Sequence, residues 1–216
     1  NFTTTSTSVR PDTTPPFGFF PGSTHAQRES IAGVGTAYSY YKLGTNLLFT
    51  GIAVTGGFEL RTRNIPDETV YQLPMTLGTS WTTTYVESLI VTLPPPLPPQ
   101  ITITNYTVIN TVDAHGNLTL PGGGVHQALR LRTDRRFTSG TSSIRTIYYT
   151  ILARNGASVG VLAADTLQPN SGTINVSSSS WNGPVVLTSV RSSDAVPADF
   201  ALMQNYPNPF NPSTKI

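Results

Sequence analysis

From about Ile31 onward, the chain consists of short segments rich in Val, Ile, Thr, Tyr and Phe, separated by Gly, Pro and Asn. The segments favour pleated strands and the interruptions favour turns, so the pattern predicts an all-β fold without helices. Many short strands joined by turns are typical of an antiparallel β-sandwich, here with Greek-key or jelly-roll-like topology. Strands are expected within residues 35–44, 46–63, 70–93, 100–112, 117–120, 125–133, 142–153, 158–167 and 172–178.

Residues 1–30 differ in composition from this region, because Thr, Ser and four prolines replace the strand pattern. Proline opposes helix and central strand alike, so we expect an extended Pro/Thr-rich arm that precedes a β-sandwich domain at residues 31–193. Phe17, Phe19 and Phe20 are too apolar for a pure spacer. These rings are a candidate assembly arm, packing either on their own domain or on a neighbouring subunit.

Alternation is clearest between Leu129 and Phe137. Leu129, Leu131, Thr133 and Phe137 fall on one strand face, predicted as core, and Arg130, Arg132, Asp134 and Arg136 fall on the other, predicted as solvated. Turn-forming residues flank this strand on both sides, so residues 118–152 predict a three-stranded meander. Proline-rich residues 93–99 predict an exposed connection between two long strands.

Charge is scarce, at 11% of residues with a net value of +2, so nucleic acid is not an expected partner. The chain has no cysteine, which excludes disulfides and thiolate metal sites. Its apolar runs are too short to span a bilayer, so we expect a protein that is not membrane-spanning.

Catalytic patterns are weak. Residues 156–160 match the G-x-S-x-G nucleophile motif, but strand-like sequence follows where a helix is required, which favours a hairpin turn. The three histidines, His25, His115 and His126, predict surface positions rather than a metal or acid–base site. We therefore expect a non-enzymatic protein with no cofactor.

The carboxylates also show no pattern that predicts a metal or catalytic site. Asp113 to Asn117 lack the succession of acidic ligands of a calcium loop, so they predict a tight turn. Adjacent Asp67 and Glu68 would point to opposite strand faces, which makes them a poor catalytic pair.

Two features leave a recognition function open. The arginines of the 129–137 strand either bind an acidic polysaccharide or solvate a strand face and discourage edge pairing. Trp81 and Trp181 are either platforms on which sugar rings stack or core residues.

The end of the chain, residues 200–216, reads FALMQNYPNPFNPSTKI. It resembles the opening of the type A C-terminal sorting domain of the type IX (Por) secretion system. The resemblance implies recognition by the type IX secretion machinery and export across the outer membrane of a Bacteroidetes-like diderm bacterium, to the extracellular space or the outer cell surface. Residues 194–216 are accordingly expected to be a linker and the start of that sorting domain, which stops at Ile216. The matching positions are Phe200, Leu202, Gln204, Asn205, Tyr206, Pro207, Asn208, Pro209, Phe210, Asn211, Pro212, Thr214 and Ile216.

A looser resemblance covers residues 73–167, which are similar to a β-rich domain found upstream of such sorting domains. Its D-x-x-G-x-L-x-L-P-x-G stretch, here Asp113 to Gly123, predicts a turn, a strand and a Pro-Gly turn, so it specifies fold rather than chemistry. Asp12-Thr13-Thr14 and Asp165-Thr166-Leu167 resemble the O-glycan acceptor pattern of Bacteroidetes-type secreted proteins, which makes Thr13 and Thr166 candidate glycosylation sites.

Together these features predict a secreted, non-enzymatic structural or adhesive cell-surface protein. We expect it to be the subunit of an extracellular filament, a homopolymer assembled through terminal arms and open strand edges. The alternative is a carbohydrate-binding or other recognition module of a larger exported protein, with a surface polysaccharide as partner.

Overall fold

The computed structural model describes residues 6–120, 124–164 and 175–183. These residues form an all-β fold, as predicted, with two short 3-10 segments, η1 (Pro11–Thr13) and η2 (Pro15–Phe19), and no α-helix. The strands are β1 (Ser6–Val9), β2 (His25–Ile31), β3 (Gly35–Leu43), β4 (Asn46–Gly56), β5 (Glu59–Ile65), β6 (Glu68–Gln72), β7 (Ser80–Thr92), β8 (Gln100–Thr119), β9 (Val125–Ser139), β10 (Ser142–Ala153), β11 (Ser158–Ala163) and β12 (Val176–Asn182).

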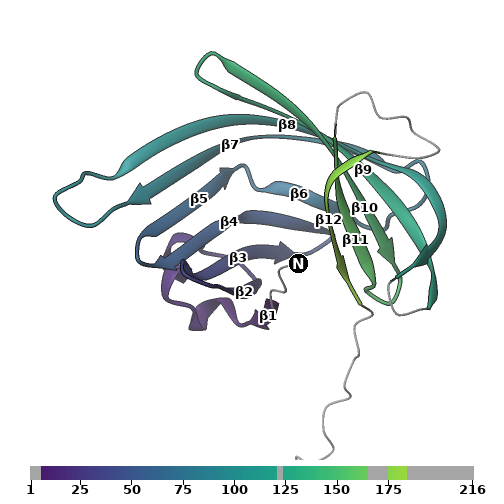
Figure 1. Ribbon diagram of the computed structural model, residues 1–216, viewed down its shortest axis with the longest axis horizontal. Helices are drawn as coiled ribbons and strands as arrows, with labels where there is room; N and C mark the ends of the chain where they lie inside the picture. The colour runs from purple at the N-terminus through teal and green to yellow at the C-terminus, as the bar shows by residue number, and fades with distance from the viewer. Residues whose placement is uncertain (1–5, 121–123, 165–174, 184–216) are drawn as a thin grey trace, which may run out of the picture. The chain divides into compact units, whose positions relative to one another are not determined.

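All twelve strands belong to one antiparallel sheet, in which strands that are consecutive in sequence pair with each other (Figure 1). The exception is β6, which pairs with β4 and leaves β5 to pair with β7. The described strands therefore show a meander, and the expected sandwich with Greek-key or jelly-roll topology is not shown. Short strands with turn signals are common to both architectures, so the sequence pattern alone does not distinguish them.

The meander predicted at residues 118–152 is confirmed by the pairing of β9 with both β8 and β10. The connection at residues 93–99 joins the long strands β7 and β8 and is largely exposed, as predicted. Asp113 to Asn117, predicted as a turn, instead continue β8, where the register shifts between Val112 and Ala114. This bulge admits an extra residue into the ladder, so turn-like residues occur without a turn.

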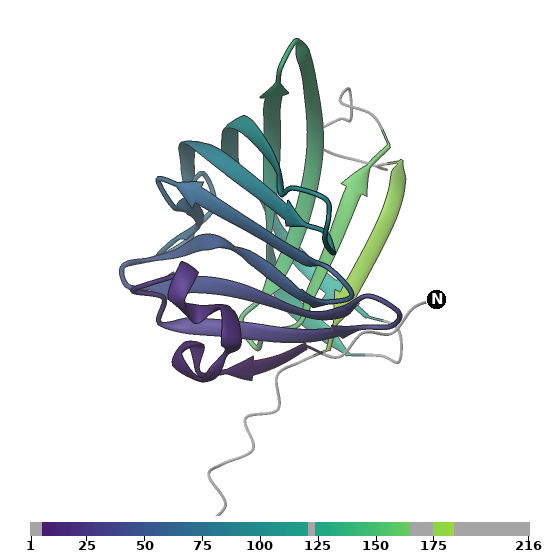
Figure 2. The same cartoon turned by 90° about the vertical axis from the view of Figure 1, so that its left-hand side faces the viewer.

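The prediction for the N-terminal segment is wrong where the structure describes it. Residues 6–30 do not form an extended arm, because β1 and β2 belong to the sheet and η1 and η2 lie against it (Figure 2). Phe20 is fully buried and stacks on Tyr40, with ring centroids 4.1 Å apart. Thr14 bonds the Tyr40 hydroxyl. Proline at the start of each 3-10 turn needs no N–H partner there, so the proline-rich sequence is accommodated by turns that bury an aromatic ring.

Gly51 makes room for this ring. It lies opposite Tyr40 with φ +151°, and an added Cβ would approach Thr62 O to 2.1 Å and Phe20 Cε1 to 2.8 Å. Both the backbone conformation and the space therefore require glycine.

Two further apolar clusters lie towards the C-terminal strands. One comprises Leu118, Leu120, Ala128 and Ala157, and the other comprises Ile147, Tyr149 and Ala163. Within the described ranges, no helix has the length and apolar character needed to cross a membrane.

We predict that Gly51→Ala lowers the free energy of unfolding by about 2 kcal/mol or more, through steric overlap with the Phe20 ring and backbone strain. Chemical denaturation measures this change. Gly57→Ala is the matched control, because nothing lies within 4 Å of its added Cβ. Equal stability of the two variants would show that Phe20 is not packed against Gly51.

Candidate functional site

One face of β7, β8, β9 and β10 combines aromatic rings with polar groups. Tyr85 lies opposite Tyr106, and Arg135 lies opposite Val108 and Thr146 in the ladder. Asn110, Thr133 and Tyr148 follow on the same face. The rings of Tyr85 and Tyr106 stack with centroids 4.8 Å apart. We call this surface the Arg135 face.

Strand β6 supplies the acidic partner. Glu68 is only 5% exposed and accepts bonds from Arg135 Nη2 at 2.7 Å and from the Tyr85 hydroxyl at 3.0 Å. The Trp81 indole donates to Thr69 O at 2.9 Å, which fixes β6 at a second point. Glu68 and Arg135 come from strands that do not pair with each other. Their ion pair therefore holds β6 against the Arg135 face.

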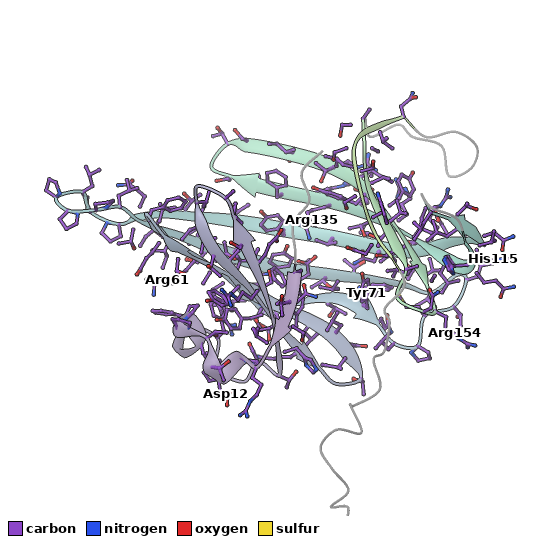
Figure 3. The ribbon with its side chains drawn as sticks, turned by 60° about the horizontal axis from the view of Figure 1, so that its bottom comes forward. Asp12, Arg61, Tyr71, His115, Arg135 and Arg154 are labelled. Atoms are coloured by element: carbon purple, nitrogen blue, oxygen red, sulfur yellow. The ribbon has the colours of Figure 1, made fainter. Side chains whose placement is uncertain are left out.

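A cleft of about 290 Å³ opens beside this ion pair. Figure 3 shows Arg135 and Tyr71 towards the middle of the ribbon, whereas Asp12, His115 and Arg154 lie at its margins. We call this cavity the Glu68 cleft. Its lining comprises Glu68, Val70 and Tyr71 from β6, and Asn110, Leu131, Thr133, Arg135, Tyr148 and Thr150 from β8, β9 and β10.

Burial changes the acid–base properties of the groups around the cleft. The pKa of Tyr85 is raised strongly, first by burial and then by the negative charge of Glu68. Burial also raises the pKa of Tyr106 and of the Glu87 carboxyl, which accepts a 3.3 Å bond from the Tyr106 hydroxyl. The tyrosines therefore act as hydrogen-bond donors and not as phenolates near neutral pH.

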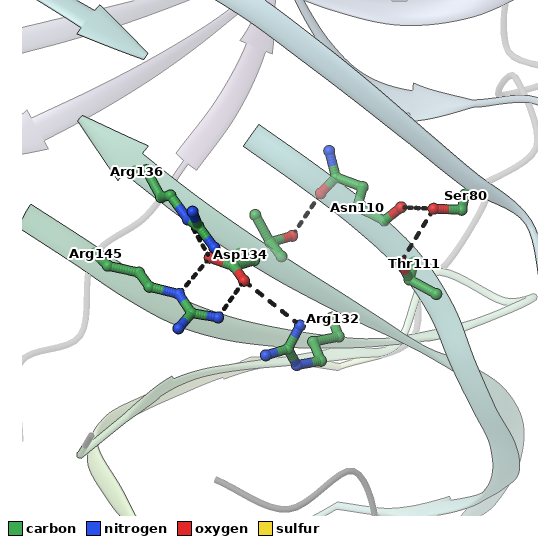
Figure 4. A network of polar contacts seen from close by, with 8 residues as sticks. Ser80, Asn110, Thr111, Arg132, Asp134, Arg136 and Arg145 are labelled. Carbon is green, nitrogen blue, oxygen red and sulfur yellow. Dashed lines mark hydrogen bonds and ion pairs between the residues drawn. The ribbon is translucent and has the colours of Figure 1, made fainter. Parts of the chain in front are cut away.

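The opposite face of the same strands holds a second polar cluster, shown in Figure 4. Asp134 is only 5% exposed and receives two bonds from Arg145, at 2.9 and 2.6 Å. Arg132 and Arg136 complete the cluster at 3.9 and 3.7 Å. The hydrogen bonds from Arg145 hold the pKa of Asp134 below its usual range. The predicted alternation of faces is thus present, but the face that carries Asp134, which was predicted as solvated, holds a buried carboxylate.

The second cleft, of about 990 Å³, is lined by His115 and His126 together with Arg154 and Asn155. Asn155 Nδ2 lies 3.0 Å from His126 Nδ1. No carboxylate lines this larger cleft, and in the described part of the chain no three His, Asp or Glu side chains form a group that could hold a metal ion. The Glu68 cleft is therefore the stronger candidate site.

The predicted assembly rings separate in the structure. Phe20 is in the core, Phe17 packs partly buried against the same cluster, and Phe19 is 55% exposed with the Arg61 guanidinium 3.7 Å from its ring centre. Thr13 is exposed at the end of η1, and its hydroxyl donates to Arg10 O. Thr166 and the sorting motif at residues 200–216 lie outside the described residues.

The structure also shows where the other residues considered in the sequence lie. Gly156 and Ala157 lie in the connection between β10 and β11, and Ser158 begins β11, so the G-x-S-x-G stretch spans the end of the predicted hairpin turn and the start of the next strand. Asp67 pairs with Lys42 at 2.7 Å, whereas Glu68 pairs with Arg135, as expected for side chains that point to opposite faces. Trp81 is partly buried, while Trp181 is 53% exposed on β12.

The sequence reasoning did not include Arg135 or Glu68 among the site residues. The sequence does contain a signal for Arg135, because this residue falls on the strand face predicted as core, between Thr133 and Phe137. A charged residue at such a position requires a buried partner. The partner is 67 residues away, so no local pattern identifies Glu68.

Comparisons of the chain with protein-family models, with curated proteins and with solved structures gave no match.

We predict that Asp134→Asn lowers the free energy of unfolding by about 1–3 kcal/mol at pH 7, because charged hydrogen bonds to Arg145 are lost. The folded-state pKa of Asp134 is depressed, so its stabilisation is complete above the usual aspartate pKa of about 4 and is lost as the pH falls through the folded-state pKa. Denaturation curves between pH 7 and pH 2 should show the difference from the unmodified chain shrinking below about pH 4.

Asp12→Asn is the control, because Asp12 pairs with Arg10 on the exposed surface and its loss should hardly change stability. A deficit in Asp134→Asn that stays constant down to pH 2 would contradict the assignment of its effect to charge.

Proposed function

We propose that this chain is a secreted, non-enzymatic structural or adhesive protein of the cell surface, and that copies of it assemble edge to edge into an extracellular filament. The observation that carries the proposal is the pair of open sheet edges. Among the described residues, β1 pairs only with β2 and β12 pairs only with β11. An unpaired edge exposes a row of N–H and C=O groups that can bind another strand.

Charged residues and prolines usually protect an edge strand against such pairing. Neither β1 (STSV) nor β12 (VSSSSWN) contains a charged residue or a proline. Every residue of β12 is exposed, including Val176 and Trp181. Proteins that must stay monomeric place lysine, proline or a covering segment at sheet edges, so this composition favours assembly.

The two edges differ, which determines the kind of assembly. Pairing β12 of one copy with β1 of the next would be a head-to-tail contact, and such contacts form open chains when the rotation does not close a ring. Residues 6–31 fold onto their own sheet. The proposal therefore assigns assembly to the strand edges, with the exposed Phe19 as the remaining candidate of the three predicted assembly rings.

The proposed route to the cell surface rests on sequence alone. The resemblance of residues 200–216 to a type IX sorting domain supports recognition by that secretion machinery and export across the outer membrane. O-glycans at Thr13 and Thr166 are proposed on the same kind of resemblance.

A second candidate function is carbohydrate recognition, with a surface polysaccharide as partner. Two observations favour it: the Glu68 cleft, which combines rings with buried polar groups, and the exposed indole of Trp181. Exposed aromatic rings and convergent polar groups are the features that bind sugars.

We predict that the purified chain forms concentration-dependent oligomers or filaments, and that Ser178→Lys with Ser179→Lys in β12 abolishes them. Lysine at an edge charges the interface and opposes strand addition. Light scattering and electron microscopy measure assembly, and circular dichroism verifies that the variant keeps its fold.

Asn105→Lys with Thr107→Lys is the matched control, since both residues are exposed in β8 and pair with β7 on one side and with β9 on the other. A chain that stays monomeric at every concentration, or a β12 variant that assembles as well as the control, would refute assembly through this edge.

A further inference from the structure

We propose that the Glu68 cleft binds one neutral sugar ring, held by hydrogen bonds from its hydroxyl groups and by stacking on Tyr148. The inference rests on the recognition function proposed above and adds the residues and the ligand class. Two walls define the site, with β6 on one side and β8, β9 and β10 on the other.

The charges of the cleft select a neutral ligand. Glu68 and Arg135 are bonded to each other at 2.7 Å, and their charges compensate. An anion at the guanidinium would lie beside the negative charge of Glu68, and a cation at the carboxylate would lie beside the positive charge of Arg135. Either ligand would therefore meet a like charge close to its binding partner, which opposes binding. Hydroxyl groups can instead bond both members of the pair without separating them.

Several groups in the cleft have hydrogen-bonding capacity to spare. Asn110 is buried and lines the cleft, and its Oδ1 accepts a 2.6 Å bond from the Thr133 hydroxyl, a bond that does not use its amide N–H groups. The buried Nε of Arg135 has no hydrogen-bond partner within the described ranges, and Tyr71 and Tyr148, which carry hydroxyls, line the same cleft. Hydroxyls that both donate and accept match a mixed set of donors and acceptors of this kind.

The rings and the size of the cleft narrow the ligand class further. Tyr148 is 37% exposed, so its ring can take the apolar C–H face of a sugar while its hydroxyl remains available. A volume of about 290 Å³ is at the lower end of small-molecule pockets, which suits one ring of a chain and not several.

Binding to neutral oligosaccharides tests the proposal. The probes are hexamers of glucose, mannose, galactose and xylose, with oligogalacturonate as the acidic counterpart, each titrated by calorimetry and followed by NMR of the tyrosine rings. We expect at least one neutral hexamer to bind. Tyr148→Ala should weaken that binding about five- to tenfold, and Tyr71→Phe should weaken it by a smaller factor, because it removes only a hydroxyl.

Ile144→Ala is the matched control, since Ile144 lies on the same strand and face as Tyr148 but does not line the cleft. Suppose that Trp181→Ala abolishes sugar binding while both tyrosine variants still bind. This result would overturn the assignment of the binding site to the Glu68 cleft, but the proposed recognition function would remain. Binding of oligogalacturonate alone would overturn the neutral ligand class. Failure of all five probes to bind would overturn the recognition function and this inference together, and assembly through the strand edges would be unaffected.

Discussion

The ion pair between Glu68 and Arg135 is the contact on which the arrangement of the central strands depends. Pairing of backbone groups places eleven strands in sequence order, but β6 departs from that path. Its position is fixed by pairing with β4, by the Trp81 indole and by the buried carboxylate that reaches β9. Taking two charges out of water is costly, and the bond from Tyr85 helps to offset this cost.

The same ion pair also lines the Glu68 cleft. Because the two charges compensate each other, the pair presents an electrically neutral polar surface to the cleft. On the other face, Asp134 gathers three arginines and leaves an excess of positive charge at the surface. One set of strands thus carries two polar clusters of different character, one electrically neutral and one with an excess of positive charge.

Much of the fold could be predicted from the sequence, because most of its pairings join consecutive strands. Alternation in β9 and turn residues on either side were enough to predict the β8–β9–β10 meander. The predictions failed where contacts between residues far apart in the sequence determine the structure. The burial of Phe20 depends on Gly51 and Tyr40, and the bulge near Asp113 is stabilised by an ion pair with Arg130. The candidate site depends on Glu68 meeting Arg135, which no periodicity reveals.

The sequential strand order also has a consequence for how the sheet is made. Each strand after β7 finds its partner in the strand synthesised just before it, so the chain can add strands one at a time in the order of synthesis. Such growth has no built-in final step, because every newly added strand presents the same kind of template as the one it covered. A filament formed through β12 would be the continuation, between molecules, of the process that builds each one.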